Sequence, residues 1–158
     1  MTLPIETRDV EAPDLAVTEA LGQRLGEGLF PGAVLGLIGP LGAGKTHLVR
    51  AIAEGLKIPD SRVVSSPTFV LIQEYSARLP IFHFDAYRLS GPRELFDLGV
   101  HEYFEAGGVC LIEWADRVAE CLPPEHLQIT LHITGPTSRR LTFEGRGTQY
   151  MELLKRMK

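Results

Sequence analysis

The stretch Ala33-Val34-Leu35-Gly36-Leu37-Ile38-Gly39-Pro40-Leu41-Gly42-Ala43-Gly44-Lys45-Thr46 decides the fold of this chain. Residues 33–38 carry no polar side chain, which predicts a strand buried on both faces, as in a parallel sheet. Residues 39–46 match the pattern G-x-x-x-x-G-K-[ST], and an amphipathic helix over residues 45–56 is predicted to follow. A buried strand, a glycine-rich turn and a helix in this order predict an α/β domain.

The glycine-rich segment is a P-loop by its pattern, and its residue types suit the binding of nucleotide phosphates. Glycines let successive backbone N–H groups point inward at phosphate oxygens, and the following helix adds its N-terminal donors. In such loops the lysine, here Lys45, reaches the β- and γ-phosphates, and the hydroxyl of Thr46 ligates Mg²⁺. The competing interpretation is a glycine-rich strand-to-helix turn without a ligand. The predicted cofactor-binding residues are Gly39, Leu41, Gly42, Ala43, Gly44, Lys45, Thr46 and His47.

Position 47 is a histidine, where many P-loops have a second Ser or Thr. The backbone N–H of His47 is still available to a phosphate, whereas the contact from a hydroxyl is missing. Two interpretations stay open: tolerated variation, or a change in affinity for the α-phosphate.

A P-loop needs an acidic partner, and the chain offers one at the end of a second apolar run. Val109-Cys110-Leu111-Ile112 leads directly to Glu113, and ligands of open α/β sheets bind beyond the carboxyl ends of the strands. Glu113 is therefore the predicted Walker-B residue, which holds Mg²⁺ directly or through water, or polarises the attacking water. The alternative is an ordinary strand-end acid paired with a base such as Arg117.

A second acid, Asp85, ends another predicted strand. Strand alternation places His83 and Asp85 on one face and Phe82 and Phe84 on the other. Asp85 is the predicted catalytic partner of Glu113 and Lys45, orienting the water or holding a metal-bound water. Its alternative role is a capping or salt-bridged aspartate near Arg88.

Three further features bear on the same site. Ser65-Ser66-Pro67-Thr68 is predicted to be a loop, in which Thr68 is a candidate Mg²⁺ ligand, as in nucleotide switches. Trp114 directly follows Glu113 and either packs on a switch loop or partner or belongs to the core. The candidates for an arginine that neutralises transition-state charge are Arg88, Arg93, Arg139 and Arg140, among which the sequence does not choose.

Length and composition set the class of protein. The chain has 158 residues, 44% apolar and 23% charged, with a net charge of −4, so we expect one globular domain over residues 1–158. No apolar run is long enough to cross a bilayer, and the N-terminus has no signal-peptide pattern. We therefore expect a cytoplasmic protein with no membrane partner. An acidic chain is not expected to bind nucleic acid tightly alone.

The remaining pattern predicts the outline of the fold. A strand is expected over residues 5–8 and a helix over 14–29. Hairpins are expected over 69–75 with 79–85 and over 127–134 with 140–143. A short helix begins near Pro92, and a helix over 149–157 closes the chain. The fold class is α/β, a three-layer P-loop NTPase-like fold with a central mixed, mainly parallel sheet and β-hairpin additions.

Four motifs in this order resemble the bacterial TsaE family, also called YjeE. They are Gly-Ala-Gly-Lys-Thr at 42–46, Ser-Pro-Thr-Phe at 66–69, His-Phe-Asp-Ala-Tyr-Arg at 83–88 and Leu-Ile-Glu-Trp at 111–114. The P-loop alone is shared by many families, whereas the other three in this order are specific. The resemblance covers residues 33–114, and His47 departs from the hydroxyl residue that is common in the family.

The resemblance implies a P-loop ATPase, with ATP and Mg²⁺ as cofactors, that is required for threonylcarbamoyl modification of the adenosine next to the anticodon in tRNA. It implies action through the TsaD–TsaB complex, with tRNA contacted indirectly. By the same resemblance Glu113 is the Walker-B acid, Asp85 serves hydrolysis and Thr68 belongs to a switch-like segment. The alternative function is a P-loop small-molecule kinase. The chain contains no N-K-x-D motif, which argues against a signalling GTPase.

Overall fold

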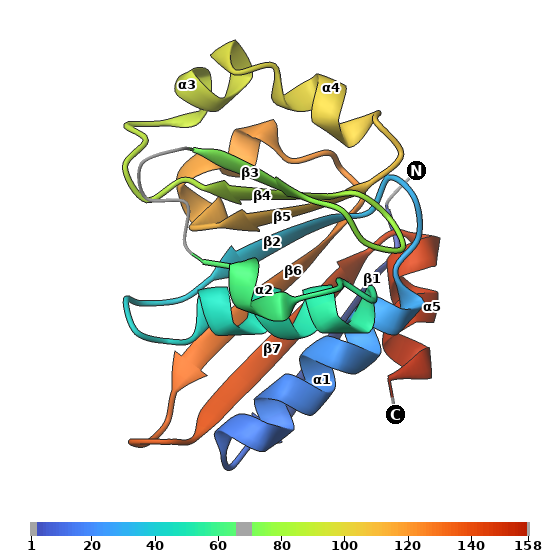
Figure 1. The fold of residues 1–158 in the computed structure, drawn as a ribbon. Helices are drawn as coiled ribbons and strands as arrows, with labels where there is room; N and C mark the ends of the chain where they lie inside the picture. The colour runs from blue at the N-terminus through green and yellow to red at the C-terminus, as the bar shows by residue number, and fades with distance from the viewer. Residues whose placement is uncertain (1–2, 66–70, 158) are drawn as a thin grey trace.

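A computed structural model describes residues 3–65 and 71–157 (Figure 1). The elements, in chain order, are β1 (Ile5–Ala12), α1 (Leu15–Gly28), β2 (Val34–Ile38), α2 (Lys45–Gly55), η1 (Ser61–Val63), β3 (Ile72–Tyr75), β4 (Ile81–Asp85), α3 (Pro92–Asp97), α4 (Val100–Phe104), β5 (Val109–Glu113), η2 (Ala115–Cys121), β6 (His126–Ile133), β7 (Arg139–Arg146) and α5 (Thr148–Arg156). Within these ranges no helix is both long and apolar enough to cross a membrane.

The described strands form one seven-stranded sheet in the order β1-β7-β6-β2-β5-β4-β3. The central strands β6, β2, β5 and β4 run parallel. The antiparallel strands lie at the two edges, where β3 pairs with β4, and β7 pairs with both β6 and β1. The α/β fold with a mixed sheet and hairpin additions is therefore confirmed.

Helices cover both faces of this sheet, so the molecule has three layers (Figure 1). Residues of α1 and α2, such as Leu25 and Ile52, pack with Leu35 and Leu37 of β2 in one apolar cluster. In the second cluster, α3, α4 and η2 pack against the opposite face of β2, β4 and β5. The strands between the two clusters are buried on both faces, as the apolar runs of the sequence predicted.

The two helices next to the P-loop approach each other closely. A Cβ atom added to Gly26 would lie 2.2 Å from the carbonyl oxygen of Ile52, and one added to Gly55 would lie 2.1 Å from that of Gln23. Only glycines allow this distance, so α1 and α2 pack backbone to backbone. This contact fixes α2, the helix that begins at Lys45.

The structure corrects several predicted boundaries. The first strand extends to Ala12 rather than Arg8, because it pairs with β7 along its whole length. The second hairpin extends to Arg146 for the same reason. The strand predicted over 69–75 begins at Ile72 among the described residues, while positions 69 and 70 lie outside them. The short helix α4 was not predicted, and Gly99 in a left-handed conformation begins it.

Candidate functional site

The P-loop connects the end of β2 to the start of α2, and two of its glycines have a backbone conformation that suits glycine. Gly42 has φ 81° and Gly44 has φ 102°, which is the left-handed region that other residues adopt at a cost. A Cβ atom at either position would meet nothing within 4 Å. The conformation of the loop, and not lack of space, therefore requires these glycines.

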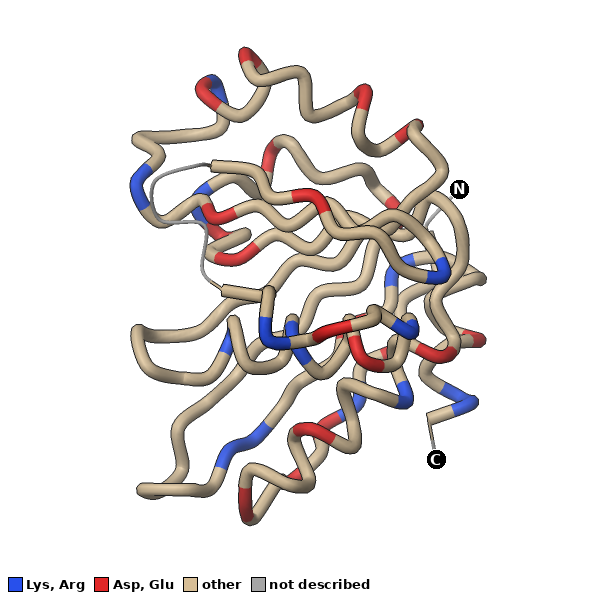
Figure 2. Tube along the Cα trace, in the orientation of Figure 1, with Lys and Arg blue, Asp and Glu red and all other residues tan. Residues whose placement is uncertain are grey.

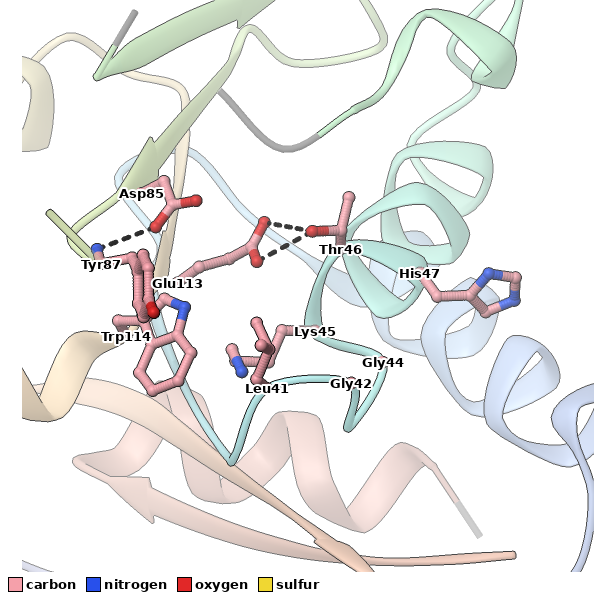
Figure 3. Close-up of a pocket in the computed structure, with 10 residues that line it drawn as sticks. All are labelled: Leu41, Gly42, Gly44, Lys45, Thr46, His47, Asp85, Tyr87, Glu113 and Trp114. Atoms are coloured by element: carbon pink, nitrogen blue, oxygen red, sulfur yellow. Dashed lines mark hydrogen bonds between the residues drawn. The ribbon is translucent and has the colours of Figure 1, made fainter. Parts of the chain in front are cut away.

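Beside this loop lies a cavity of about 370 Å³. Figure 3 shows its lining side chains, which come from the P-loop and the start of α2 on one side and from the ends of β4 and β5 on the other. The two strands are parallel, and Asp85 is the register partner of Glu113. Both predicted acids are thus brought to the same edge of the sheet, opposite Lys45 and Thr46.

Thr46 and Glu113 meet directly across this cavity. The Thr46 hydroxyl lies 2.9 Å from both carboxylate oxygens of Glu113, and the Glu113 side chain is almost fully buried. A hydroxyl and a carboxylate are oxygen ligands of the kind that Mg²⁺ prefers, with water and substrate phosphates completing its shell. In the described part of the chain no cluster of three or more His, Cys, Asp or Glu side chains is arranged to hold a metal. The Thr46 hydroxyl and the Glu113 carboxylate are oxygen donors that fit a Mg²⁺ ion.

The Lys45 side chain is folded back onto its own loop. Its Nζ donates to the carbonyl oxygens of Gly39 at 2.6 Å and Pro40 at 2.9 Å. The same ammonium lies 3.9 Å from the centre of the Trp114 ring, a cation–π contact. Trp114 therefore forms part of the site wall against Lys45, which favours a role in the site over a place in the core.

Burial and three nearby carboxylates act on the Lys45 ammonium in opposite directions. Burial lowers the pKa of the Lys45 ammonium, and the negative charges of Glu113, Asp85 and Asp116 oppose that lowering. The Lys45 ammonium is therefore suited to bind a group with more negative charge than a carboxylate, such as a phosphate.

Asp85 and the aromatic residues complete the wall. The Asp85 carboxylate accepts a hydrogen bond of 2.9 Å from the backbone N–H of Tyr87. The rings of Tyr87 and Trp114 lie 4.9 Å apart, and the Arg117 guanidinium lies over both rings, 5.3 Å and 5.6 Å from their centres. Arg117, the alternative partner of Glu113 in the sequence, thus stacks on the aromatic wall.

Sequence reasoning did not assign a role to His83, which contacts Glu113. Its Nε2 lies 2.6 Å from Glu113 Oε2, its Nδ1 lies 3.2 Å from the Tyr75 hydroxyl, and its side chain is fully buried. Strand alternation had placed His83 on the same face as Asp85. The contact with Glu113 depends on the pairing of β4 with β5, which the sequence did not contain.

His47 and Arg139 connect the P-loop and the start of α2 to other elements of the fold. The Nε2 atom of His47 pairs with Glu19 of α1 at 2.9 Å, so this side chain contacts the neighbouring helix. Arg139 of β7 donates from Nε to the carbonyl of Ala43 at 3.0 Å and from Nη2 to that of Gly42 at 3.3 Å. Arg139, one of the candidate arginines, therefore binds the backbone carbonyls of the P-loop.

The remaining predicted site residue, Thr68, lies outside the described residues. Its role as a Mg²⁺ ligand stays a prediction. Of the predicted site residues, those that line the cavity are Leu41, Gly42, Gly44, Lys45, Thr46, His47, Asp85 and Glu113, whereas Gly39 and Ala43 are not among its lining residues.

Comparison with known proteins gives consistent results. The family described as "Threonylcarbamoyl adenosine biosynthesis protein TsaE" matches residues 12–141. A Bacillus subtilis (strain 168) protein named "tRNA threonylcarbamoyladenosine biosynthesis protein TsaE" is 44% identical over 141 residues, which are 89% of this chain and 87% of that protein. A protein of the same name from Treponema pallidum is 40% identical over 125 residues, 79% of this chain and 91% of that protein.

The fold is also similar to a solved structure. The crystal structure of YdiB from Bacillus subtilis superposes with a TM-score of 0.83 at 36% sequence identity. The match covers 98% of this chain and 95% of that one. The similarity therefore includes the P-loop, both hairpins and the C-terminal helix.

Proposed function

This chain belongs to the TsaE family of threonylcarbamoyl adenosine biosynthesis proteins, and on that premise we propose that it is a Mg²⁺-dependent ATPase acting in this tRNA modification. One observation carries the proposal: a lysine, a hydroxyl and two carboxylates converge on a cavity beside a P-loop. By this proposal the chain does not transfer the threonylcarbamoyl group. It acts through the TsaD–TsaB complex, in the cytoplasm.

The proposed ATP site uses the backbone of residues 39–47 for the phosphates. By this proposal Lys45, whose Nζ contacts the carbonyls of Gly39 and Pro40, exchanges these contacts for the β- and γ-phosphates. The phosphates offer it full negative charge in place of two neutral carbonyls, so the exchange is favourable.

Thr46 and Glu113 are the proposed Mg²⁺ ligands, Glu113 either directly or through water. Bound there, Mg²⁺ neutralises charge that develops on the phosphate oxygens. Thr46 of α2 and Glu113 of β5, which are hydrogen-bonded to each other, would together hold the ion. We include Thr68 as a further proposed ligand on the sequence pattern alone.

The two acids have separate proposed tasks in hydrolysis. Glu113 is almost fully buried at the end of β5, beside Thr46, which suits a residue that holds the ion or polarises water. Asp85 ends the neighbouring strand and lines the same cavity, where its carboxylate orients the attacking water. Neither task requires a covalent intermediate on the protein.

The charge distribution supports indirect contact with tRNA. The chain has a net charge of −4, and Figure 2 shows Lys and Arg interspersed with Asp and Glu along the trace. Avid RNA binding draws on concentrated positive charge. We therefore propose that the partner complex holds the tRNA while this chain supplies the ATP cycle.

The test is the level of modified adenosine in tRNA from cells in which the variant Lys45→Ala replaces the wild type. The change removes the charge that is proposed to bind the phosphates, so the modification is expected to fall to the level of cells lacking the protein. Lys155→Ala, in an exposed lysine of α5 that pairs with Glu152, is the control and keeps the wild-type level. Wild-type modification with Lys45→Ala would contradict the proposal. Transfer of phosphate from labelled ATP to a small metabolite would favour a kinase instead.

A further inference from the structure

We propose that Tyr75 and His83 form a buried pair that positions the Glu113 carboxylate for ATP hydrolysis. The inference rests on the proposed ATPase function and adds two positioning residues to it. Neither side chain is among those that line the cavity in the described structure. Their effect on the reaction is therefore exerted through Glu113 and not by contact with the nucleotide.

The first step is the bond between His83 and Glu113. The Nε2 atom of His83 lies 2.6 Å from Oε2 of Glu113, and both side chains are buried. A carboxylate oxygen accepts hydrogen bonds, so we assign the hydrogen of the His83 ring to Nε2. The bond comes from β4, the strand that pairs with β5, and ties the Glu113 side chain to the sheet.

The second step is the control of the imidazole by Tyr75. With its hydrogen on Nε2, the ring has a lone pair on Nδ1, and the Tyr75 hydroxyl 3.2 Å away donates to it. The donor direction therefore runs from Tyr75 through His83 to Glu113.

The third step is what happens when the nucleotide site is loaded. Glu113 accepts from Thr46 and from His83. In the proposed function Thr46 would hold Mg²⁺, and its hydroxyl would then no longer donate to Glu113. The bond from His83 does not involve the P-loop and remains. It is this bond that holds Oε2 of Glu113 in place during hydrolysis, as supporting hydrogen bonds do for ligands of metal sites.

The kinetic test compares Tyr75→Phe with the matched control Tyr150→Phe. Each change removes one buried hydroxyl, and the Tyr150 hydroxyl accepts from the backbone N–H of Val34, at the start of β2. For Tyr75→Phe we expect kcat for MgATP to fall by about tenfold, as for loss of one buried hydrogen bond, with KM within about twofold of wild type. Tyr150→Phe is expected to change neither value beyond that range.

Two variants of His83 test the route through the imidazole. His83→Gln keeps an N–H donor at the position of Nε2, and His83→Phe removes it. We expect His83→Gln to restore most of the kcat that His83→Phe loses. Adding Tyr75→Phe to His83→Phe is expected to cause no further loss, because Tyr75 acts only through His83. Losses that multiply in the double variant would overturn the inference.

A spectroscopic measurement gives a readout that does not depend on activity. Long-range ¹H–¹⁵N spectra of the folded protein report the tautomer of His83, which we expect to be Nε2–H in the wild type and mixed in Tyr75→Phe. An unchanged tautomer in Tyr75→Phe, or its wild-type kcat, would overturn the inference. A wild-type protein that hydrolyses no MgATP, alone or with partners, would instead overturn the proposed function itself.

Discussion

The substitution Arg139→Met tests whether the β6–β7 hairpin supports the P-loop. Arg139 donates to the carbonyls of Ala43 and Gly42 in the loop. It also donates to the carbonyls of Gly135 and Ser138 in its own hairpin, which fixes the guanidinium. Methionine keeps an unbranched apolar side chain and removes every donor.

The size of the effect follows from the two bonds to the loop. A typical protein hydrogen bond contributes about 0.5–1.5 kcal/mol net, so the two bonds together stabilise the ordered loop by about 1–3 kcal/mol. Without them, nucleotide binding has to order the loop, which corresponds to a loss of affinity of about 5- to 150-fold. Because the bond to Gly42 is long, at 3.3 Å, and exposed, we expect a loss of about fivefold.

Isothermal titration with MgADP at fixed ionic strength measures this loss without hydrolysis. The control is Arg140→Met, in the adjacent arginine of β7, which pairs with Glu11 of β1 at 2.6 Å. Removing that exposed ion pair is expected to leave the affinity within about twofold. An unchanged affinity in Arg139→Met, or an equal loss in both variants, would refute the proposed support of the loop.

Three further expectations can be checked directly. Gly55→Ala places a Cβ 2.1 Å from the carbonyl oxygen of Gln23, so urea denaturation should show a free energy of unfolding lower by about 1–3 kcal/mol; equal or higher stability would contradict the close helix contact. The emission of Trp114, the single tryptophan, should change on adding MgATP as the Lys45 ammonium leaves the ring, and this change should be absent in Lys45→Ala. Burial lowers the pKa of His126 below its ordinary value of 6.5. The unfolded chain therefore binds this proton more readily than the folded protein does. The contribution of His126 to the free energy of unfolding is complete above pH 6.5 and is lost as the pH falls below that value. If the free energy of unfolding fell as steeply with pH in His126→Asn, this assignment would be wrong.

Much of the site was predictable because its residues end continuous apolar runs. Val109 to Ile112 form a strand buried on both faces, and the carboxylate that follows must lie at the sheet edge. Asp85 was placed at the end of β4, where strand alternation puts it on the same face as His83. The P-loop pattern placed Lys45 and Thr46 at the start of a helix, as observed. These patterns are local in the sequence, and the parallel pairing of β4 and β5 brings the carboxyl ends of the two strands together.

What the sequence did not contain are the contacts between elements distant along the chain. His83 meets Glu113 only because β4 pairs with β5 in one register, and Arg139 reaches the P-loop only because the hairpin turns back over it. The first strand was predicted too short because its pairing with β7, which continues to Ala12, is a contact between distant parts of the chain. In the fold Asp9 contacts Thr142 of β7, and Glu11 contacts Arg140 of the same strand.

The most direct test of the central claim is the rate of MgATP hydrolysis by the purified protein, alone and with purified TsaD–TsaB and tRNA. The account predicts a low rate alone, a higher rate in the complete mixture, and loss of both in Glu113→Gln, which keeps the shape of the side chain and removes its charge. A rate that does not respond to TsaD–TsaB and tRNA, or that survives Glu113→Gln, would contradict it.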